Sequence, residues 1–135
     1  MKEALFEKAA HITPELSPEE TIFFAEKPEE LPLYETFRSL LLAEVGEAGI
    51  QVSKTQITFS GKYDFAFVSH PRRKKDCGIL VSFGLFHRVE SDRILYASEP
   101  YPHRWTHHML LASPEEIDHE LMGWLKEAYW FANTK

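Results

Sequence analysis

The sequence predicts an α+β fold with a mostly antiparallel sheet of four or five strands, flanked by two N-terminal helices and one C-terminal helix. The first observation behind it is a repeated Ser-Pro-Glu-Glu at 17–20 and 113–116. Each copy puts Ser at the N-cap, Pro at the first helical position and Glu at the third, which is the pattern of a capping box. The second is that polar and apolar residues alternate between these copies, as in strands. Because the strands are joined by short links, we expect antiparallel pairing with the helices on one face of the sheet.

Three helices are predicted. The first Ser-Pro-Glu-Glu begins a short helix that should end near Lys27-Pro28, and Pro32 begins a longer helix that reaches Val45. The second copy begins the final helix at Ser113. The apolar stripe of that helix consists of Ile117, Leu121, Trp124, Leu125 and Ala128. We expect residues 1–16 to form an N-terminal arm or short helix and residues 17–135 to form a single α+β domain.

The strands are predicted from runs with a period of two and from the turn residues between them. The candidates are 51–60, 63–70, 78–88, 93–98 and 104–111. Ser60-Gly61-Lys62 is typical of a tight turn. Pro100-Tyr101-Pro102 is interpreted as a rigid connection, because proline cannot donate a hydrogen bond inside a sheet.

Length and composition are typical of one globular domain. The chain has 135 residues, enough for a single core, and its one cysteine excludes both an internal disulfide and a cysteine-cage metal site. No apolar run approaches the roughly 20 residues of a membrane span, and the N-terminus lacks the apolar core of a signal peptide. We therefore expect a cytoplasmic protein that has no membrane partner.

Charge is unevenly distributed along the chain. The net charge is −6, but residues 50–112 hold nine basic and five acidic side chains, a balance of +4. One interpretation is that acidic helices flank a mildly basic sheet. The other is that the middle segment attracts an anionic ligand. The acidity of the whole chain argues against a protein that binds duplex DNA.

No motif for catalysis or for a cofactor is present. His107 and His108 are adjacent in a predicted strand, so they point to opposite faces and cannot easily ligate one metal ion. The chain has no Gly-x-Ser-x-Gly elbow, no Walker loop and no Gly-x-Gly-x-x-Gly. Cys77 follows the basic run 72–75, but the sequence fixes no base beside it. The sequence therefore predicts no catalytic residue, no metal site and no cofactor, and it does not favour an enzyme.

Polar residues recur on one side of the predicted strands. They are Lys54, Gln56, Thr58, Ser82, Arg104, Thr106 and His108. If the helices cover only the other side, these groups share an open face that suits a small anion, a nucleotide or a peptide. The same pattern is also typical of a solvated sheet surface without a ligand. The basic run 72–75 is either a solvated turn or a contact for phosphates.

Several scattered pieces resemble one bacterial family. They are Lys54-Thr55-Gln56-Ile57-x-Phe59, Phe65-Ala66, Arg104-x-x-His107-His108 and the final-helix pattern Ile117-Asp118-x-Glu120-Leu121-x-x-Trp124-Leu125-x-x-Ala128-Tyr129. Together they resemble a domain of unknown function, number five-six-five-five, whose relatives are sometimes labelled predicted transport proteins. The resemblance covers roughly residues 20–131 and implies a bacterial, cytoplasmic protein without an assigned activity.

These observations favour a binding module that holds a small anionic or polar ligand on the open face. The expected ligand-binding residues are Lys54, Gln56, Thr58, Arg104, His107 and His108. Three alternatives stay open. They are single-stranded nucleic-acid binding, a protein-interaction subunit that could be a homodimer, and a histidine-dependent enzyme that uses His107 or His108 with Lys54.

Overall fold

The computed structural model describes residues 15–46, 48–73 and 76–134. Within them the chain forms three α-helices, two 3-10 turns and six strands. The helices are α2 (Pro18–Phe23), α3 (Leu31–Val45) and α4 (His119–Asn133), and the 3-10 turns are η1 (Pro28–Glu30) and η2 (Pro114–Glu116). The strands are β1 (Gly49–Val52), β2 (Ile57–Ser60), β3 (Asp64–Ser69), β4 (Ile79–Leu85), β5 (Tyr96–Tyr101) and β6 (Arg104–Leu111). None of the described helices combines the length and the apolar character needed to cross a membrane.

The six strands form one sheet in the order β1-β2-β3-β4-β6-β5, and every neighbouring pair is antiparallel. The predicted α+β class with an antiparallel sheet is confirmed, but the predicted count of four or five strands is wrong. The additional strand arises within the predicted strand 51–60, which folds back on itself. There the hydroxyl and the N–H of Ser53 both bond to the carbonyl oxygen of Gln56, at 3.1 and 2.9 Å. Serine side chains compete in this way with a regular strand, and the result is a tight turn between β1 and β2.

The segment around the prolines also differs from its prediction. Pro100 was expected in a connection, but it lies within β5, which pairs with β6 on one side only. Such a position is compatible with proline, because the N–H that proline lacks is not needed at the edge of a sheet. The pairing becomes irregular between Ser98 and Tyr101, where Pro100 interrupts it.

The helix signals hold for the start of α2 and for α3, but α2 ends at Phe23 and not near Lys27-Pro28, and the last helix starts later than predicted. Ser17 caps α2, because its hydroxyl accepts the N–H of Glu20 at 3.2 Å. At the second Ser-Pro-Glu-Glu the chain forms only η2, and Ile117 then leaves helical geometry with φ −87° and ψ 89°. Asp118 takes over as the N-cap of α4 by accepting the Leu121 N–H at 3.1 Å. A capping box therefore predicts where the chain turns helical, but not how long that turn continues.

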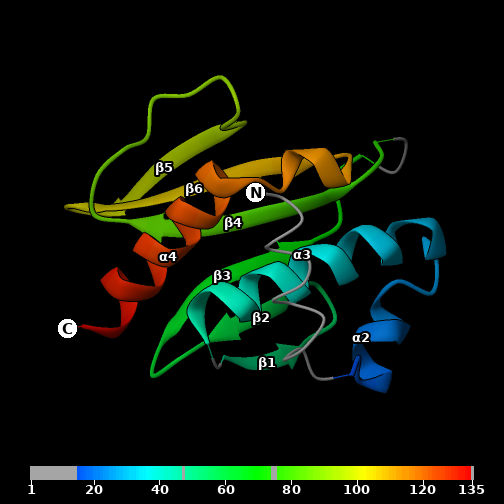
Figure 1. Cartoon of the computed structure of the whole chain (residues 1–135). Coiled ribbons are helices and arrows are strands. Elements are labelled where there is room, and N and C mark those ends of the chain that lie inside the picture. The colour runs from blue at the N-terminus through cyan, green and yellow to red at the C-terminus, as the bar shows by residue number, and fades with distance from the viewer. Residues whose placement is uncertain (1–14, 47, 74–75, 135) are drawn as a thin grey trace.

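Both long helices pack on the same face of the sheet (Figure 1). Phe59 of β2 meets Phe37 of α3 edge to face at 6.1 Å. Phe83 of β4 stacks on Trp124 of α4 at 6.0 Å. Phe59 and Phe83 lie in register on either side of Ala66, so they share one face. The prediction that the helices cover one face is confirmed, and the opposite face carries no helix in the described part of the chain.

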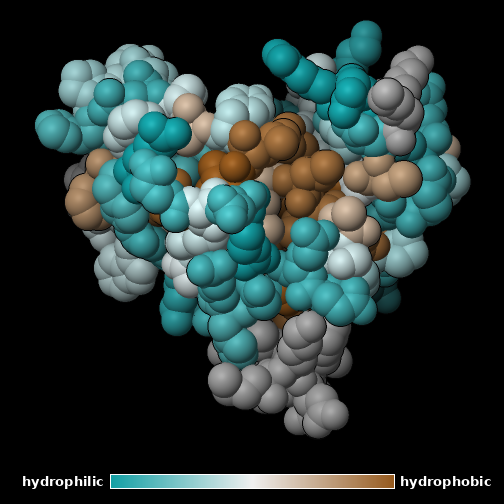
Figure 2. Space-filling model, turned by 90° about the horizontal axis from the view of Figure 1, so that it is seen from above, coloured by the Kyte–Doolittle hydropathy of each residue, from teal (hydrophilic) through white to brown (hydrophobic). Residues whose placement is uncertain are grey.

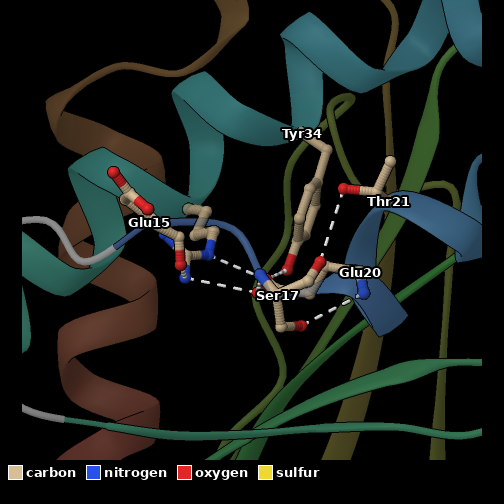
Figure 3. Close-up of polar contacts among 6 residues, drawn as sticks. Glu15, Ser17, Glu20, Thr21 and Tyr34 are labelled. Atoms are coloured by element: carbon tan, nitrogen blue, oxygen red, sulfur yellow. Dashed lines mark hydrogen bonds and ion pairs between the residues drawn. The ribbon is translucent and has the colours of Figure 1, made fainter.

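A buried ion pair joins α2 to α3 (Figure 3). The Glu20 carboxylate lies 2.7 Å from the Arg38 Nε and also accepts the Tyr34 hydroxyl and, at 3.0 Å, the N–H of Ser17. Arg38 in turn donates to the carbonyl oxygen of Glu15 at 3.0 Å. Burial favours the neutral form of Glu20, but the hydrogen bonds and the Arg38 charge outweigh it and hold the Glu20 pKa below its usual value. This network is internally satisfied, so we assign it to the fold.

Hydrophobic residues also reach the surface on the side where β5 and β6 lie. Figure 2 views the molecule from that side and shows hydrophobic residues gathered at the centre, with hydrophilic residues around them. Leu95, directly before β5, and Tyr96 are among the exposed large side chains. Hydrophobic residues therefore lie at the molecular surface as well as in the core between the helices and the sheet.

Candidate functional site

One row of side chains crosses the open face of the sheet. It consists of Thr58, Phe67, Ser82, His108 and Tyr96, which are register neighbours on β2, β3, β4, β6 and β5. The row alternates with the core residues along every strand, so it lies opposite α3 and α4. Ser82 is 7% exposed and Thr58 is 8% exposed, whereas Tyr96 is 46% exposed. The short side chains of Ser82 and Thr58 are therefore largely covered by larger neighbouring side chains on this face.

His108 is the central ionisable group of this row. Its Nδ1 lies 2.8 Å from the Ser82 hydroxyl oxygen, and its ring stacks on Tyr96 with centroids 4.3 Å apart. Burial lowers the pKa of His108, and the positive charge of Arg72 lowers it further. The imidazole is therefore neutral at pH 7 and available for hydrogen bonding.

A pocket of about 380 Å³ adjoins this row at Phe67, where β3 and β6 begin and β4 ends, and Phe131 and Ala132 of α4 also line it. Its walls are largely aromatic and comprise Tyr63, Phe65, Phe67, Tyr101, Trp105 and Phe131. Gly84 and Thr106 also line it. Gly84 is open toward its surroundings, since a Cβ there would meet only the Trp105 carbonyl oxygen, at 3.9 Å. The pocket therefore offers flat apolar surfaces that suit a planar ligand.

Arg104 is the cation of this pocket. It is half-buried at the start of β6, and its guanidinium lies 5.5 Å from the centroid of the Phe131 ring. The residues that the structure describes form no salt bridge with Arg104, although the Asp64 carboxylate lines the same pocket. Stacking on an aromatic ring holds a guanidinium in place and leaves its N–H donors available. Arg104 can therefore receive a carboxylate or a phosphate.

The structure brings four of the expected ligand-binding residues to the open side of the sheet. Thr58, Arg104 and His108 lie on it directly. Gln56 precedes β2 and donates from Nε2 to the Thr58 hydroxyl at 3.4 Å. Arg104 and His108 are the two that can contribute charge or a titratable nitrogen.

The expected placement of Lys54 was wrong, because Lys54 is not on a strand. It lies in the turn between β1 and β2 and lines a separate groove of about 1090 Å³ beside α2. His70, Arg72 and Lys27 line the same groove, together with the acids Glu19, Glu26 and Glu29. This groove is electrostatically mixed, and the site on the open face does not include Lys54.

The expected placement of His107 in the ligand site was also wrong. His107 is 0% exposed on the core face, where its ring stacks on Phe83 at 5.3 Å. Its Nε2 accepts the N–H of Val89 at 2.9 Å, and burial lowers its pKa. The adjacent histidines do point to opposite faces, as strand geometry requires. His107 holds the segment after β4 against the core.

Sequence reasoning missed the aromatic walls of the pocket. Tyr101 stands between two prolines and was interpreted as part of a rigid connection, and Tyr63 was predicted only as the first residue of the strand 63–70. Phe131 is near the C-terminal end of α4 and reaches the sheet only through the tertiary fold. The available signal was the clustering of Tyr101 and Arg104 on either side of one tight turn.

Among residues 15–46, 48–73 and 76–134, no group of His, Cys, Asp and Glu is arranged to hold a metal ion. Cys77 is exposed. The open face instead offers a cation, a neutral imidazole, hydroxyls and aromatic rings.

Fold and site together define a small α+β domain with helices on one face of an antiparallel sheet and a polar, aromatic cleft at the end of the other face, where the last turn of α4 helps to line it. A family model described as Domain of unknown function (DUF5655) matches residues 19–132, and the chain belongs to this family. No curated protein and no solved structure matches the chain.

Proposed function

We propose that the protein is a binding module for a small anionic ligand that carries a planar group. The observation that supports the proposal is the placement of Arg104, half-buried and stacked on Phe131 inside an aromatic pocket. The planar group would lie between the aromatic walls, and the anionic group would take the guanidinium donors. Because a charge-assisted hydrogen bond is about twice as strong as a neutral one, Arg104 would supply much of the specificity.

Arg104 fits a ligand better than it fits a structural role. A guanidinium that stabilises a fold usually faces a carboxylate, as Arg38 does with Glu20. Arg104 instead contacts an aromatic ring at the rim of a pocket whose other walls are mostly apolar. An anion entering that pocket would meet a cation that is already partly desolvated and already oriented.

The test is a thermal-shift screen of planar anions, for example adenosine monophosphate, cytidine monophosphate and indole-3-carboxylate, with inorganic phosphate as the non-planar reference. Hits are then measured by isothermal titration calorimetry. Arg104→Gln should weaken binding roughly ten- to a hundredfold, since hydrogen bonds to charged groups contribute about 1.5–3 kcal/mol. Gly84→Val should also weaken it, because the added side chain narrows the pocket without removing the charge.

The matched control is Arg88→Gln. Arg88 also lies over an aromatic ring, Trp105, at 5.6 Å, but it is paired with Glu90 and does not line the pocket. Its substitution should leave the affinity unchanged. The proposal fails if no planar anion binds, or if Arg88→Gln and Arg104→Gln weaken binding equally.

A further inference from the structure

We infer that the ligand of this face is a single-stranded nucleic acid, with one base in the Arg104 pocket and the following nucleotides running along β6, across the row at His108, toward Arg72. This inference rests on the proposed function and names the class of its ligand. It is supported by the length of the face, its aromatic surfaces, the placement of its cations and the polar groups between them.

The face is longer than a single small ligand. Arg104 and His108 lie four residues apart on β6, which corresponds to about 13 Å at 3.3 Å per residue. Both side chains are on the same face, since residues an even number apart in a strand point the same way. A mononucleotide would fill the pocket and leave the row uncovered, whereas an extended single strand would cover both.

Exposed aromatic rings lie both near Arg104 and near His108. Tyr101 and Tyr63 are exposed at the pocket, and Tyr96 is 46% exposed while stacked on His108. Unpaired bases stack on exposed rings of this kind with little sequence preference. Because the bases of a duplex are already stacked on one another, the same surfaces favour single strands over duplexes.

Cations also flank the row. Arg104 lies at the start of β6, and Arg72 follows the end of β3, where its positive charge contributes to the lowered pKa of His108. Two separated cations match a ligand whose negative charges repeat along its length, as phosphates do in a nucleic-acid backbone. A small ligand with one anionic group would need only one of them.

Polar groups between the cations can contact the edges of unpaired bases. The Thr106 hydroxyl lies between the two ends, and the Asp64 carboxylate lines the pocket. A carboxylate accepts a hydrogen bond from an exocyclic amino group, which adenine and cytosine carry and uracil lacks. We therefore expect oligoadenylate and oligocytidylate to bind more tightly than oligouridylate.

The experiment is fluorescence anisotropy with end-labelled adenylate of increasing length, from the mononucleotide to the octanucleotide, on the full chain. Affinity should rise at least tenfold from the mononucleotide to the tetranucleotide and should fall with added salt. A hairpin duplex of the same length should bind at least tenfold more weakly than the single strand.

Single substitutions distinguish the contribution of the Arg104 pocket from that of the surface near His108 and Arg72. Arg104→Gln should weaken the mononucleotide and the tetranucleotide alike, whereas Arg72→Gln and Tyr96→Ala should weaken the tetranucleotide fivefold or more and leave the mononucleotide unchanged. Arg72 and Tyr96 are exposed, so both substitutions should leave the melting temperature near that of the wild type. Lys126→Gln is the control, because Lys126 is an exposed cation of α4 that pairs with Glu44.

The outcomes separate the two proposals. Binding of mononucleotides with no gain in affinity on lengthening overturns the nucleic-acid inference and keeps the proposed function. Binding of another planar anion without binding of any nucleotide also overturns the nucleic-acid inference and keeps the proposed function. If no planar anion of any kind binds, the proposed function fails, and the inference fails with it.

Discussion

Arg38 and Arg104 show how differently one residue type can be used at two places in this chain. Arg38 is 4% exposed, and its guanidinium shares the Glu20 carboxylate with Tyr34. Arg104 is half-buried over Phe131 at the rim of a pocket. A buried cation needs a paired anion to be tolerated, and a partly solvated one does not. Substituting Arg38 should therefore affect stability, whereas substituting Arg104 should affect binding.

Glu20→Gln should destabilise the protein by about 3–5 kcal/mol, because it leaves the Arg38 guanidinium buried without its counter-charge. Chemical denaturation with urea, followed by tryptophan fluorescence, measures this difference. Glu19→Gln is the matched control, since Glu19 is its exposed neighbour in the same helical turn and should lie within about 0.5 kcal/mol of the wild type. Equal effects of the two substitutions would show that the ion pair is not a major contributor.

His107 should make stability depend on pH. Burial lowers its pKa in the folded state, while in the unfolded state the pKa is about 6.5. The unfolded chain therefore binds more protons in acid, so this contribution is full above about pH 6.5 and is lost as the pH falls through the folded value. The melting temperature should drop between pH 7 and pH 5.

Comparing variants isolates this contribution from that of the carboxylates. His107→Leu should be less stable at both pH values, since the Val89 N–H loses its acceptor, but the drop between pH 7 and pH 5 should be smaller. His119→Gln, at an exposed position, should retain the wild-type drop. An unchanged drop in His107→Leu would contradict the assignment.

The segment between β4 and β5 is anchored to the start of α4 by one arginine. Arg93 donates to the Asp118 Oδ1 at 3.0 Å, to the Glu120 Oε1 at 2.7 Å and to the Glu116 carbonyl oxygen at 2.7 Å. Its guanidinium also lies 5.7 Å from the centroid of the Trp124 ring. The acids hold the Arg93 pKa above its usual value despite burial, and the capping N–H and Arg93 hold the Asp118 pKa below its usual value. The segment is therefore tied to the helix end at several points.

Two substitutions of Asp118 can separate its two roles. Asp118→Asn keeps a good N-cap and loses the charge opposite Arg93, whereas Asp118→Ala loses both. The alanine variant should be less stable than the asparagine variant by about 1 kcal/mol, the usual contribution of an N-cap. Urea unfolding of both variants measures the difference, and equal stabilities would mean that the cap contributes little to α4.

Most helix ends and strands could be predicted because their signals are local. Ser17 and Pro18 mark α2, and alternation marks the face to which Ile57 and Phe59 belong. The turn at Ser53 was missed because its polar residues continue the alternation of the strand around them. The late start of α4 was missed because two N-cap signals, Ser113 and Asp118, stand five positions apart.

Neither the order of the strands across the sheet nor the pocket could be predicted from the sequence. Alternation predicts that Arg104 and His108 share a face, and both occupy β6 positions of the same register parity. It does not predict that Phe131 of α4 closes over Arg104, because this contact depends on how the final helix crosses the sheet. Lys54 was expected on a strand because the turn at Ser53 was not predicted. In the structure that turn puts Lys54 and its neighbours in a loop.

Protection against hydrogen exchange should follow position in the sheet. β4 lies between β3 and β6 and is almost entirely buried, whereas β1 and β5 each pair on one side only. Amides of β4 should exchange at least tenfold more slowly than those of β1 and β5, since edge strands open locally before the core does. Hydrogen exchange measured by mass spectrometry tests this. Slow exchange in β1 or β5 would mean that another surface covers that edge.

The insertion of β6 between β4 and β5 has a consequence for the newly made chain. β1 to β4 pair in the order in which they emerge from the ribosome, but the second neighbour of β4 comes only after β5. Until β6 and α4 are released, one edge of β4 stays unpaired and Phe83 lacks its cover from Trp124. The nascent domain therefore carries an incompletely paired sheet from the completion of β4 at Leu85 until β6 and α4 are made, so the rate of translation over that stretch affects how much of the domain aggregates.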